Sequence, residues 1–551
     1  MTAGGNWQTG AVPGPDENAQ PANAEPARPA GPPQPEVTAP GAREAQPAAQ
    51  AAVGAPSGPP PPPVPPGGGR RGLSRRDALR LGLIGIGGVV VGGLGGFAIG
   101  RSTAPGVAVP HPLAGAPEGD PLASGVFPIG IADDQRTFVD AEGQAFFYLA
   151  DTPWNAISRM TRESFDTLAT ARRDAGFTAL QLSVLDFDTG AENAYGHRPF
   201  AVQGALDDPV VNEGDDYWTH VAWCIDRCAE LGLVAALVPS WYGGWGDAWR
   251  GYVTEDNAGA YGSFLAERYG DRANVWWLLG GDNDPTTEGN ETAGVPGGLD
   301  RGPRIAETIA MGRALAAGMT QPHLMSYHTS RERSVEEFFG DEEWYTISAA
   351  YSGADPVPYV AAEYERDTVR PIVLWESYYD ERTRDPILDR RDLRAQAYRA
   401  ILAGAAGYAY GHEQVWPVLE DWIPALDADS AGDITVLSRA LSTYAQTPLT
   451  PITDGAPAAG LVVDGYGTPG TTSEVTAATL PDGAGALAYF GEPRTVVTID
   501  TTALDPEAAY DIRWIDPATG EEFFFADDRT GVDVSVGWPS TWSDALLVIR
   551  R

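Results

Sequence analysis

The stretch Val275-Trp276-Trp277-Leu278-Leu279-Gly280-Gly281-Asp282 is an unbroken apolar run that ends in two glycines and a carboxylate. Such a run is typical of a buried strand in a parallel barrel, where the C-terminal end of the strand delivers side chains to a site. A second stretch, Pro371-Ile372-Val373-Leu374-Trp375-Glu376, repeats the pattern and is followed by Tyr378 and Tyr379. We therefore expect two carboxylates at the ends of two buried strands.

The segments around these two stretches alternate between short apolar runs and amphipathic runs, and a glycine often follows the amphipathic run. This alternation predicts an α/β fold, a (β/α)8 TIM barrel over residues 126–446. Strands are expected at residues 146–151, 177–185, 234–241, 275–282, 323–329, 344–351, 370–377 and 407–413. Helices are expected at residues 163–175, 215–231, 257–269, 304–318 and 392–403. Short strand-like runs separated by turns then predict a small all-β sandwich domain over residues 447–551.

The N-terminal part of the chain has a different composition. Residues 1–69 are rich in Pro and Ala, and we expect a disordered tail there. Residues 70–101 place Ser74-Arg75-Arg76 ahead of an apolar, glycine-rich run at 81–100, which resembles a twin-arginine export signal and is also long enough for a signal anchor. Residues 102–125 read as a linker. Either signal predicts an extracellular or cell-surface protein, with a membrane tether through residues 81–100 if the signal is uncleaved.

The formal net charge of −38 argues against nucleic acid as a partner, because nucleic acid rewards basic patches. A neutral polysaccharide or oligosaccharide is compatible with this charge. The two cysteines, Cys224 and Cys228, lie four residues apart in a predicted helix and read as buried apolar residues rather than a disulfide. No cluster of His and Cys residues accompanies them, so we expect no metal and no other cofactor.

Asp282 and Glu376 end the fourth and seventh predicted strands, which face one another across a barrel. A pair of carboxylates is the usual apparatus for cleaving a glycosidic bond. A gap of about 5–5.5 Å between the carboxyl groups would imply a retaining mechanism, and a gap of about 6.5–9.5 Å an inverting one. Each acid could instead cap its strand or pair with an arginine.

Other residues near the strand ends are candidates for sugar contacts, because aromatic rings suit the apolar faces of sugars. We expect such contacts from Asp151, Trp154, Trp241, Tyr327, His328, Tyr351, Tyr379 and His412. Asp151 could instead cap the turn that follows it. His328 and His412 could instead be hydrogen-bonded structural groups.

Several motifs, in the same order along residues 127–440, resemble the apiosidase-like family of glycoside hydrolases. The motifs are Asp151-Thr152-Pro153-Trp154, Asn193-Ala194-Tyr195-Gly196-His197-Arg198-Pro199-Phe200, Ala258-Gly259-Ala260-Tyr261, Gly280-Gly281-Asp282, His323-Leu324-Met325-Ser326-Tyr327-His328 and Ala403 through His412. The domain after residue 447 resembles a β-sandwich that commonly follows this catalytic domain and often carries a collagen-binding label.

The resemblance implies a TIM barrel that hydrolyses a glycan with Asp282 as acid/base and Glu376 as nucleophile. It also implies that Asn193 and Tyr195 contact the substrate. The family releases apiose from pectin, but this chain departs from the pattern: Ser377 replaces a usual proline, Asp380 replaces a Glu, and residues 344–354 lack the usual polar run. The reaction class therefore carries over better than the sugar, and a pentose- or deoxysugar-containing glycan is expected.

Two rival functions belong to other classes. A non-catalytic glycan-binding surface protein could keep the barrel and its aromatic cleft without the reaction. The other alternative is a lyase or esterase that acts on a polysaccharide, but an esterase would need a Gly-x-Ser-x-Gly elbow, which this chain lacks. The retention of both acids favours the hydrolase.

Overall fold

The computed structural model describes most of the chain from residue 126 onward. The described residues are 126–287, 302–321, 323–353, 355–383, 386–445, 448–452, 460–531, 534–539 and 541–551. The predicted tail, export signal or anchor, and linker lie outside these residues. Within them, no helix is both long enough and apolar enough to cross a membrane.

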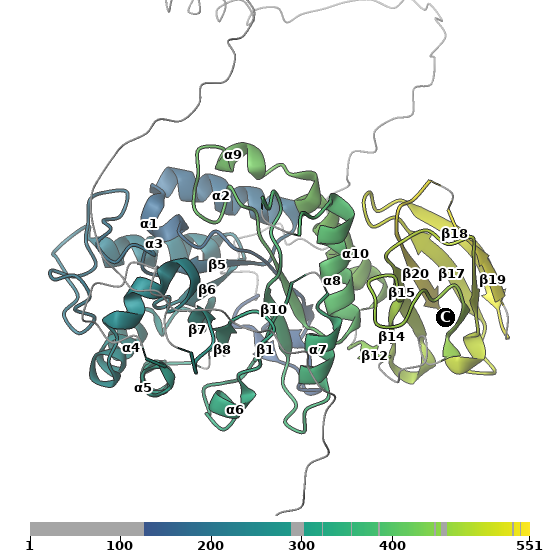
Figure 1. The fold of residues 1–551 in the computed structure, drawn as a ribbon, viewed down its shortest axis with the longest axis horizontal. Helices are drawn as coiled ribbons and strands as arrows, with labels where there is room; N and C mark the ends of the chain where they lie inside the picture. The colour runs from purple at the N-terminus through teal and green to yellow at the C-terminus, as the bar shows by residue number, and fades with distance from the viewer. Residues whose placement is uncertain are drawn as a thin grey trace, which may run out of the picture. The chain divides into compact units, whose positions relative to one another are not determined.

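Eight parallel strands form the central sheet and confirm the predicted barrel (Figure 1). They are β4 (Tyr148–Asp151), β5 (Ala179–Ser183), β6 (Val234–Val238), β7 (Val275–Asn283), β8 (Met325–Thr329), β9 (Ser348–Tyr351), β10 (Ile372–Glu376) and β11 (Gly407–Tyr410). Their order in the sheet is β8-β7-β6-β5-β4-β11-β10-β9. The backbone N–H groups of Thr346 and Ile347, just before β9, donate to the Met325 carbonyl of β8, so the ends of the sheet meet and the barrel is nearly closed.

The predicted helices are present as α2 (Arg162–Ala175), α3 (Tyr217–Glu230), α4 (Glu255–Tyr269), α5 (Ile305–Gly318) and α8 (Arg390–Leu402). Side chains that accept a backbone N–H of the first turn begin several of them, as Asp389 does for Asp392 in α8. The structure adds elements that the sequence analysis did not place. These are α1 (Ala156–Arg159), the 3-10 helix η1 (Gly244–Gly251), α6 (Glu336–Phe339), α7 (Val357–Tyr364), α9 (Trp422–Ala425) and α10 (Asp429–Tyr444).

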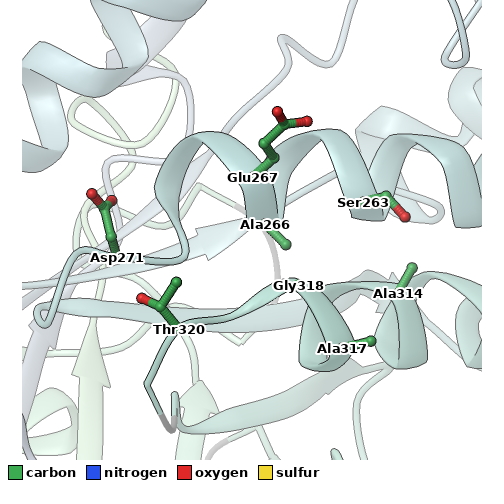
Figure 2. A pocket seen from close by; sticks show the side chains of 8 residues that line it. All are labelled: Ser263, Ala266, Glu267, Asp271, Ala314, Ala317, Gly318 and Thr320. Carbon is green, nitrogen blue, oxygen red and sulfur yellow. The ribbon is translucent and has the colours of Figure 1, made fainter.

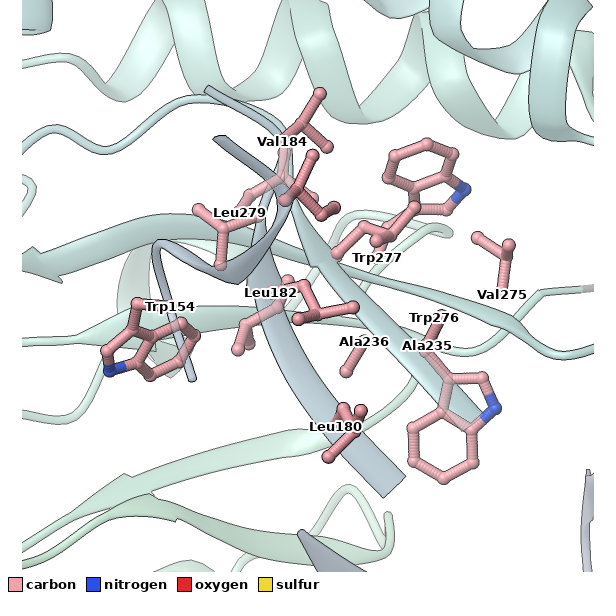
Figure 3. Close-up of a cluster of buried hydrophobic side chains, with 14 of the residues drawn as sticks. Trp154, Leu180, Leu182, Val184, Ala235, Ala236, Val275, Trp276, Trp277 and Leu279 are labelled. Carbon is pink, nitrogen blue, oxygen red and sulfur yellow. The ribbon is translucent and has the colours of Figure 1, made fainter. Parts of the chain in front are cut away.

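Apolar side chains cover both faces of the barrel strands. Figure 3 shows Leu180 and Leu182 of β5 together with Trp276 and Trp277 of β7, whose successive side chains point to opposite faces of the strand. All four side chains are buried, and their packing supplies the main stabilising term of the barrel. A three-stranded antiparallel sheet, β1 (Gly130–Ile131), β2 (Phe138–Val139) and β3 (Ala145–Phe146), packs Phe138 against the Trp276 ring with centroids 5.0 Å apart.

Helices α4 and α5 pack closely because small residues line the contact between them. A shallow groove between the two helices is lined by Ser263, Ala266, Glu267, Asp271, Ala314, Ala317, Gly318 and Thr320 (Figure 2). A Cβ at Gly262 of α4 would lie 2.8 Å from the Met311 carbonyl oxygen of α5. The close approach therefore requires glycine at this position.

Antiparallel sheets follow the barrel and confirm the predicted all-β domain. One sheet has the order β12-β14-β15-β20-β17-β18 and the other β13-β16-β19. Their bounds are β12 (Thr450–Pro451), β13 (Val462–Asp464), β14 (Thr476–Thr479), β15 (Gly485–Phe490), β16 (Val496–Ile499), β17 (Tyr510–Ile515), β18 (Glu522–Arg529), β19 (Val534–Gly537) and β20 (Ala545–Arg550), with the 3-10 helices η3 (Pro481–Gly483) and η4 (Thr501–Ala503). Strand β14 was not predicted, because Thr476-Ala-Ala-Thr479 lacks the large apolar residues that mark the other strands.

Candidate active site

The end of β7 bends so that Asp282 leaves the strand direction. Gly280, Gly281 and Asp282 have φ values of 89°, 99° and 43°, and the pairing with β8 shifts register between Gly280 and Asn283. Glycine adopts positive φ readily, whereas an aspartate there is uncommon. A Cβ at Gly281 would overlap the Trp241 ring. The two glycines thus create the turn that aims Asp282, and strained residues of this kind cluster at functional sites.

His328 on β8 connects the two predicted catalytic acids. The backbone N–H of Asp282 donates to His328 Nδ1 over 2.9 Å. Nε2 of the same ring lies 3.0 Å from Glu376 Oε2. Because Nδ1 accepts a hydrogen bond, the ring carries its proton on Nε2. The buried imidazole therefore fixes the backbone of one acid relative to the carboxylate of the other.

Glu376 at the end of β10 receives a second hydrogen bond from the neighbouring strand. Tyr351 Oη donates to Glu376 Oε1 over 3.0 Å, and Arg331 donates to the same phenol oxygen over 3.0 Å. Burial, with the nearby charges of Glu376 and Asp282, raises the pKa of Tyr351 well above its usual value. The phenol therefore keeps its proton and can donate a hydrogen bond to the carboxylate.

A pocket at the C-terminal ends of the strands contains both acids among aromatic side chains. It is lined by Trp154, Phe187, Trp241, Asp282, Arg331, Tyr351, Glu376, Ser377, Tyr379, Arg382, Glu413 and Trp416. The Trp154 and Trp241 rings meet edge to face at 4.7 Å, and Trp154 Nε1 donates to Tyr379 Oη over 2.7 Å. Such rings provide apolar walls with fixed positions, which suits the faces of sugar rings.

The pocket also brings opposite charges together. Glu413 is a third carboxylate on its wall, and Trp416 Nε1 donates to Glu413 Oε2 over 3.1 Å. Arg331 and Arg382 place their guanidinium groups 4.8 Å and 4.2 Å from the ring centre of Tyr378. The pocket can therefore offer both acceptors and donors to the hydroxyl groups of a ligand.

The structure brings six of the predicted site residues onto the pocket wall, namely Trp154, Trp241, Asp282, Tyr351, Glu376 and Tyr379. His328 lies beside them as a buried, hydrogen-bonded residue, which is the second of the two roles that the sequence left open. The other predicted contacts do not line this pocket.

Asp151 is fully buried and its carboxylate is paired with the equally buried Arg172 of α2, with Oδ2 2.6 Å from Nε. Its Oδ1 also accepts the backbone N–H of Thr152 over 2.8 Å. This geometry matches the local, structural alternative and leaves no surface of Asp151 for a sugar.

Four further candidates have structural partners outside the pocket. Asn193 accepts the backbone N–H groups of Tyr195 and His197, each over 3.0 Å, and so shapes its own loop. Tyr195 Oη accepts from the backbone N–H at the start of α2 over 2.7 Å. The buried Tyr327 Oη accepts from Asn283 over 2.6 Å, and His412 Nε2 lies 3.9 Å from the Asp380 carboxylate.

Phe187, Arg331 and Arg382 line the pocket although the sequence analysis did not select them. Phe187 directly follows Asp186 after β5, and Arg331 follows the end of β8 by two residues. Their position just after strand ends could have identified them as pocket residues. Arg382 carries no such sign, because it lies six residues after Glu376 in a long loop. Within the described part of the chain, no group of three or more His, Cys, Asp or Glu side chains could hold a metal ion.

An eight-stranded parallel barrel with acids and aromatic rings at its C-terminal mouth is the arrangement of glycoside hydrolases. Residues 132–447 match the family described as "Apiosidase-like, catalytic domain". The chain therefore belongs to the apiosidase-like family and has a glycoside hydrolase catalytic domain. No protein with a curated description matches the sequence.

Solved structures share the fold at low sequence identity. A glycoside hydrolase family 5 protein from Bacteroides vulgatus is 20% identical with a TM-score of 0.66, over 77% of this chain and 93% of that chain. A structure described as "Glycoside hydrolase" is 19% identical with a TM-score of 0.65, over 77% of this chain and 97% of the other. A glycoside hydrolase candidate from Bacteroides vulgatus is 16% identical with a TM-score of 0.55, over 77% of this chain and 83% of that chain.

Proposed function

We propose that this protein is an exported, retaining glycoside hydrolase that cleaves a glycan containing a pentose or a deoxysugar. Asp282 acts as acid/base and Glu376 as nucleophile. The observation that carries the proposal is the bridge through His328, which connects Asp282 and Glu376 at the mouth of one aromatic pocket. Paired acids held in a fixed relation at such a mouth are what glycosidic cleavage requires.

The environment of Glu376 supports the nucleophile role. Tyr351 donates to one of its oxygens, and His328 Nε2 lies 3.0 Å from the other. These contacts hold the carboxylate in one orientation. A carboxylate held in this way can attack the anomeric carbon of a sugar bound in the pocket.

The reaction then proceeds in two steps. Glu376 forms a bond to the anomeric carbon while the bond to the glycosidic oxygen breaks, and Asp282 gives its proton to that oxygen. In the second step a water molecule gives a proton to Asp282. The water oxygen forms a bond to the anomeric carbon while the bond between that carbon and Glu376 breaks. The net change is addition of one water across the glycosidic bond with retained configuration.

The test begins with the purified protein and a panel of aryl glycosides that includes pentofuranosides. Glu376→Ala should abolish turnover of every substrate that the wild type cleaves. Asp282→Ala should keep part of its activity on substrates with good leaving groups, because these leave without an acid, and it should regain more with added azide, because azide attacks the glycosyl-enzyme without a base. Asp134→Asn, whose carboxylate accepts the backbone N–H of Arg136 outside the pocket, serves as a matched acid control.

Wild-type activity of both variants would remove these two residues from the mechanism. NMR of the first anomer released separates retention from inversion. If the wild type binds glycans but cleaves none of the panel, the non-catalytic glycan-binding function replaces the hydrolase.

The export part of the proposal depends on Arg75 and Arg76. Changing both to Lys should leave folded protein in the cytoplasm if the twin-arginine route reads them. Unchanged export would point to another secretion route or to a plain signal anchor.

A further inference from the structure

Helix α8 is bound to the C-terminal domain by a buried ionic network. Arg394 donates through Nε and Nη2 to the two carboxylate oxygens of Asp544 over 2.8 and 2.5 Å, and through Nη1 to Asp433 over 3.0 Å. Tyr489 Oη of β15 donates to Asp544 over 2.8 Å. Arg394 is 3% exposed and both aspartates are fully buried, so solvent screens this network little.

An aromatic stack reinforces the same contact. The rings of Tyr398 on α8 and Tyr489 on β15 stack with their centres 4.8 Å apart. Arg399 of α8 also donates through Nη1 to the Glu474 carbonyl oxygen of the C-terminal domain over 2.8 Å. Two successive turns of one helix are thus held by the β domain.

The same helix holds the two loops that flank the predicted nucleophile. Gln396 accepts the backbone N–H of Tyr378 over 2.9 Å and donates to the Tyr378 carbonyl over 3.2 Å. Arg399 binds both carboxylate oxygens of Asp355 through Nη2, over 2.9 and 3.1 Å. Gln396 is 1% exposed, so water does not compete with its two hydrogen bonds to Tyr378.

These two loops lead directly to the pocket. Tyr378 lies two residues after Glu376, its ring contacts the guanidinium groups of Arg331 and Arg382, and both arginines line the pocket. On the other loop, the backbone N–H of Ser352 donates to the Glu376 carbonyl over 3.3 Å. Ser352 Oγ in turn donates to the Asp355 carbonyl over 2.8 Å. Each loop is therefore connected to α8 at one end and to Glu376 at the other.

From these contacts we infer that the C-terminal domain is a positioning element of the active site, acting through α8. Gln396 and Arg399 are the positioning residues, and Arg394 is the anchor that joins them to the β domain. Catalytic groups need support that fixes their position closely, and displacement of about 1 Å can cost on the order of a hundredfold in rate. The role assigned to Glu376 rests on the proposed function, but the coupling of the domain to the loops does not.

The first test measures hydrogen exchange in the full chain, because it needs no substrate. Tyr489→Phe removes one hydrogen bond to Asp544 and keeps the stacked ring, so the variant should fold. Asp544→Asn weakens the same contact more strongly, because it removes the charge that pairs with Arg394. Both variants should speed amide exchange about tenfold in peptides that cover residues 348–353 and 377–383, although the altered residue lies in the other domain. Exchange in β5 and β6 should stay at the wild-type rate.

A matched pair of substitutions tests the barrel end of the connection. Gln396→Met should speed exchange in the same two peptides, whereas Gln181→Met changes an equally buried glutamine of β5 and should not. If Tyr489→Phe and Asp544→Asn speed exchange only within the C-terminal domain and α8, the domain does not position the loops. A uniform increase over the whole barrel would also overturn the inference, because it indicates global destabilisation.

The second test uses any aryl glycoside that the wild type cleaves. Tyr489→Phe and Gln396→Met should lower kcat about tenfold with a smaller change in KM, because misplacement of Glu376 weakens the transition state more than the ground state. A protein that cleaves no glycoside contradicts the proposed function, while the exchange result still decides the coupling. Wild-type kcat in both variants with active enzyme contradicts the positioning role itself.

Discussion

Gly281 occupies a backbone position that no other residue can take without loss. Its φ of 99° lies in the left-handed region, and a Cβ would overlap the Trp241 ring that forms part of the pocket wall. Gly281→Ala should therefore lower kcat/KM by about a hundredfold and destabilise the fold by about 1–3 kcal/mol. Kinetics on a cleavable glycoside and thermal unfolding measure the two effects.

Gly143 provides the control for this substitution. It also has a positive φ, 77°, but nothing lies within 4 Å of an added Cβ. Gly143→Ala should therefore show only the cost of the backbone conformation, about 1 kcal/mol, with unchanged kinetics. Equal kinetic loss at both positions would mean that the overlap with Trp241 is not what aims Asp282.

The hydrogen bond between Tyr351 and Glu376 gives a second prediction. Tyr351→Phe removes a donor to the carboxylate and should lower kcat about tenfold to a hundredfold, with little change in the melting temperature. Tyr269→Phe is the matched control, because its buried hydroxyl donates to the Trp218 carbonyl over 2.9 Å and does not line the pocket. Similar activity of the two variants would contradict the role of Tyr351.

Sequence patterns reveal single residues only where local chemistry marks them. Asp282 and Glu376 stood out because each carboxylate abruptly ends an apolar run. Asp151 has the same signature, yet its charge is neutralised by Arg172, whose place beside it depends on how α2 packs against β4. Arg382 was missed for the opposite reason, because the path of a loop brings it to the pocket. Partners formed by tertiary packing leave no mark in the local sequence.

At the scale of elements, α4 and α5 show how glycine permits close helix packing. Gly262→Ala would place a Cβ 2.8 Å from the Met311 carbonyl oxygen, so the helices must separate, and the fold should lose about 1–3 kcal/mol. Gly259→Ala in the same helix meets nothing within 4 Å and should gain about 0.5–1 kcal/mol from helix propensity. Denaturant unfolding of both variants measures the difference, and equal effects would contradict the packing argument.

Elements with a strong apolar pattern in the sequence were predictable, and elements without a clear pattern or start signal were not. All eight barrel strands follow from apolar runs, because both faces of a parallel strand are buried. Helix α10 was missed although Ile434, Leu437 and Leu441 recur at helical spacing. Its first residue follows a loop without a side-chain cap, so no start signal separated it from the preceding segment.

For the whole molecule, the architecture was predictable and the coupling between its domains was not. A repeated helix, glycine and strand pattern leads to a barrel because few other folds accommodate it. The ion pair of Arg394 with Asp544 joins residues 150 positions apart, and nothing near either residue in the sequence announces the other. The acidic composition argued against nucleic acid as a partner, but it gave no information on this contact.

Two buried histidines predict how stability depends on pH. Burial lowers the pKa of His220 and of His323 to about 4 in the folded protein. An unfolded chain restores the ordinary value of about 6.5. Between these values the unfolded state binds more protons than the folded state, so the free energy of unfolding falls as the pH drops from about 6.5 to 4. Each histidine should contribute about 3 kcal/mol to this fall, and nothing above pH 6.5.

Urea unfolding between pH 4 and pH 7.5 measures this dependence on the whole chain. His220→Gln and His323→Gln should each flatten the curve in this window, and the double variant should flatten it further, because the sites lie on different elements. Each single variant should also lose some stability at pH 7, since His220 Nε2 contacts the Ile157 carbonyl over 3.0 Å. A slope below pH 6.5 that survives unchanged in the double variant would contradict the assignment to these two histidines. Burial acts to raise the pKa of Asp186, but hydrogen bonds from Arg159 and Ser158 hold it below the ordinary carboxyl value, so the contribution of Asp186 is lost only below that value, outside this pH window.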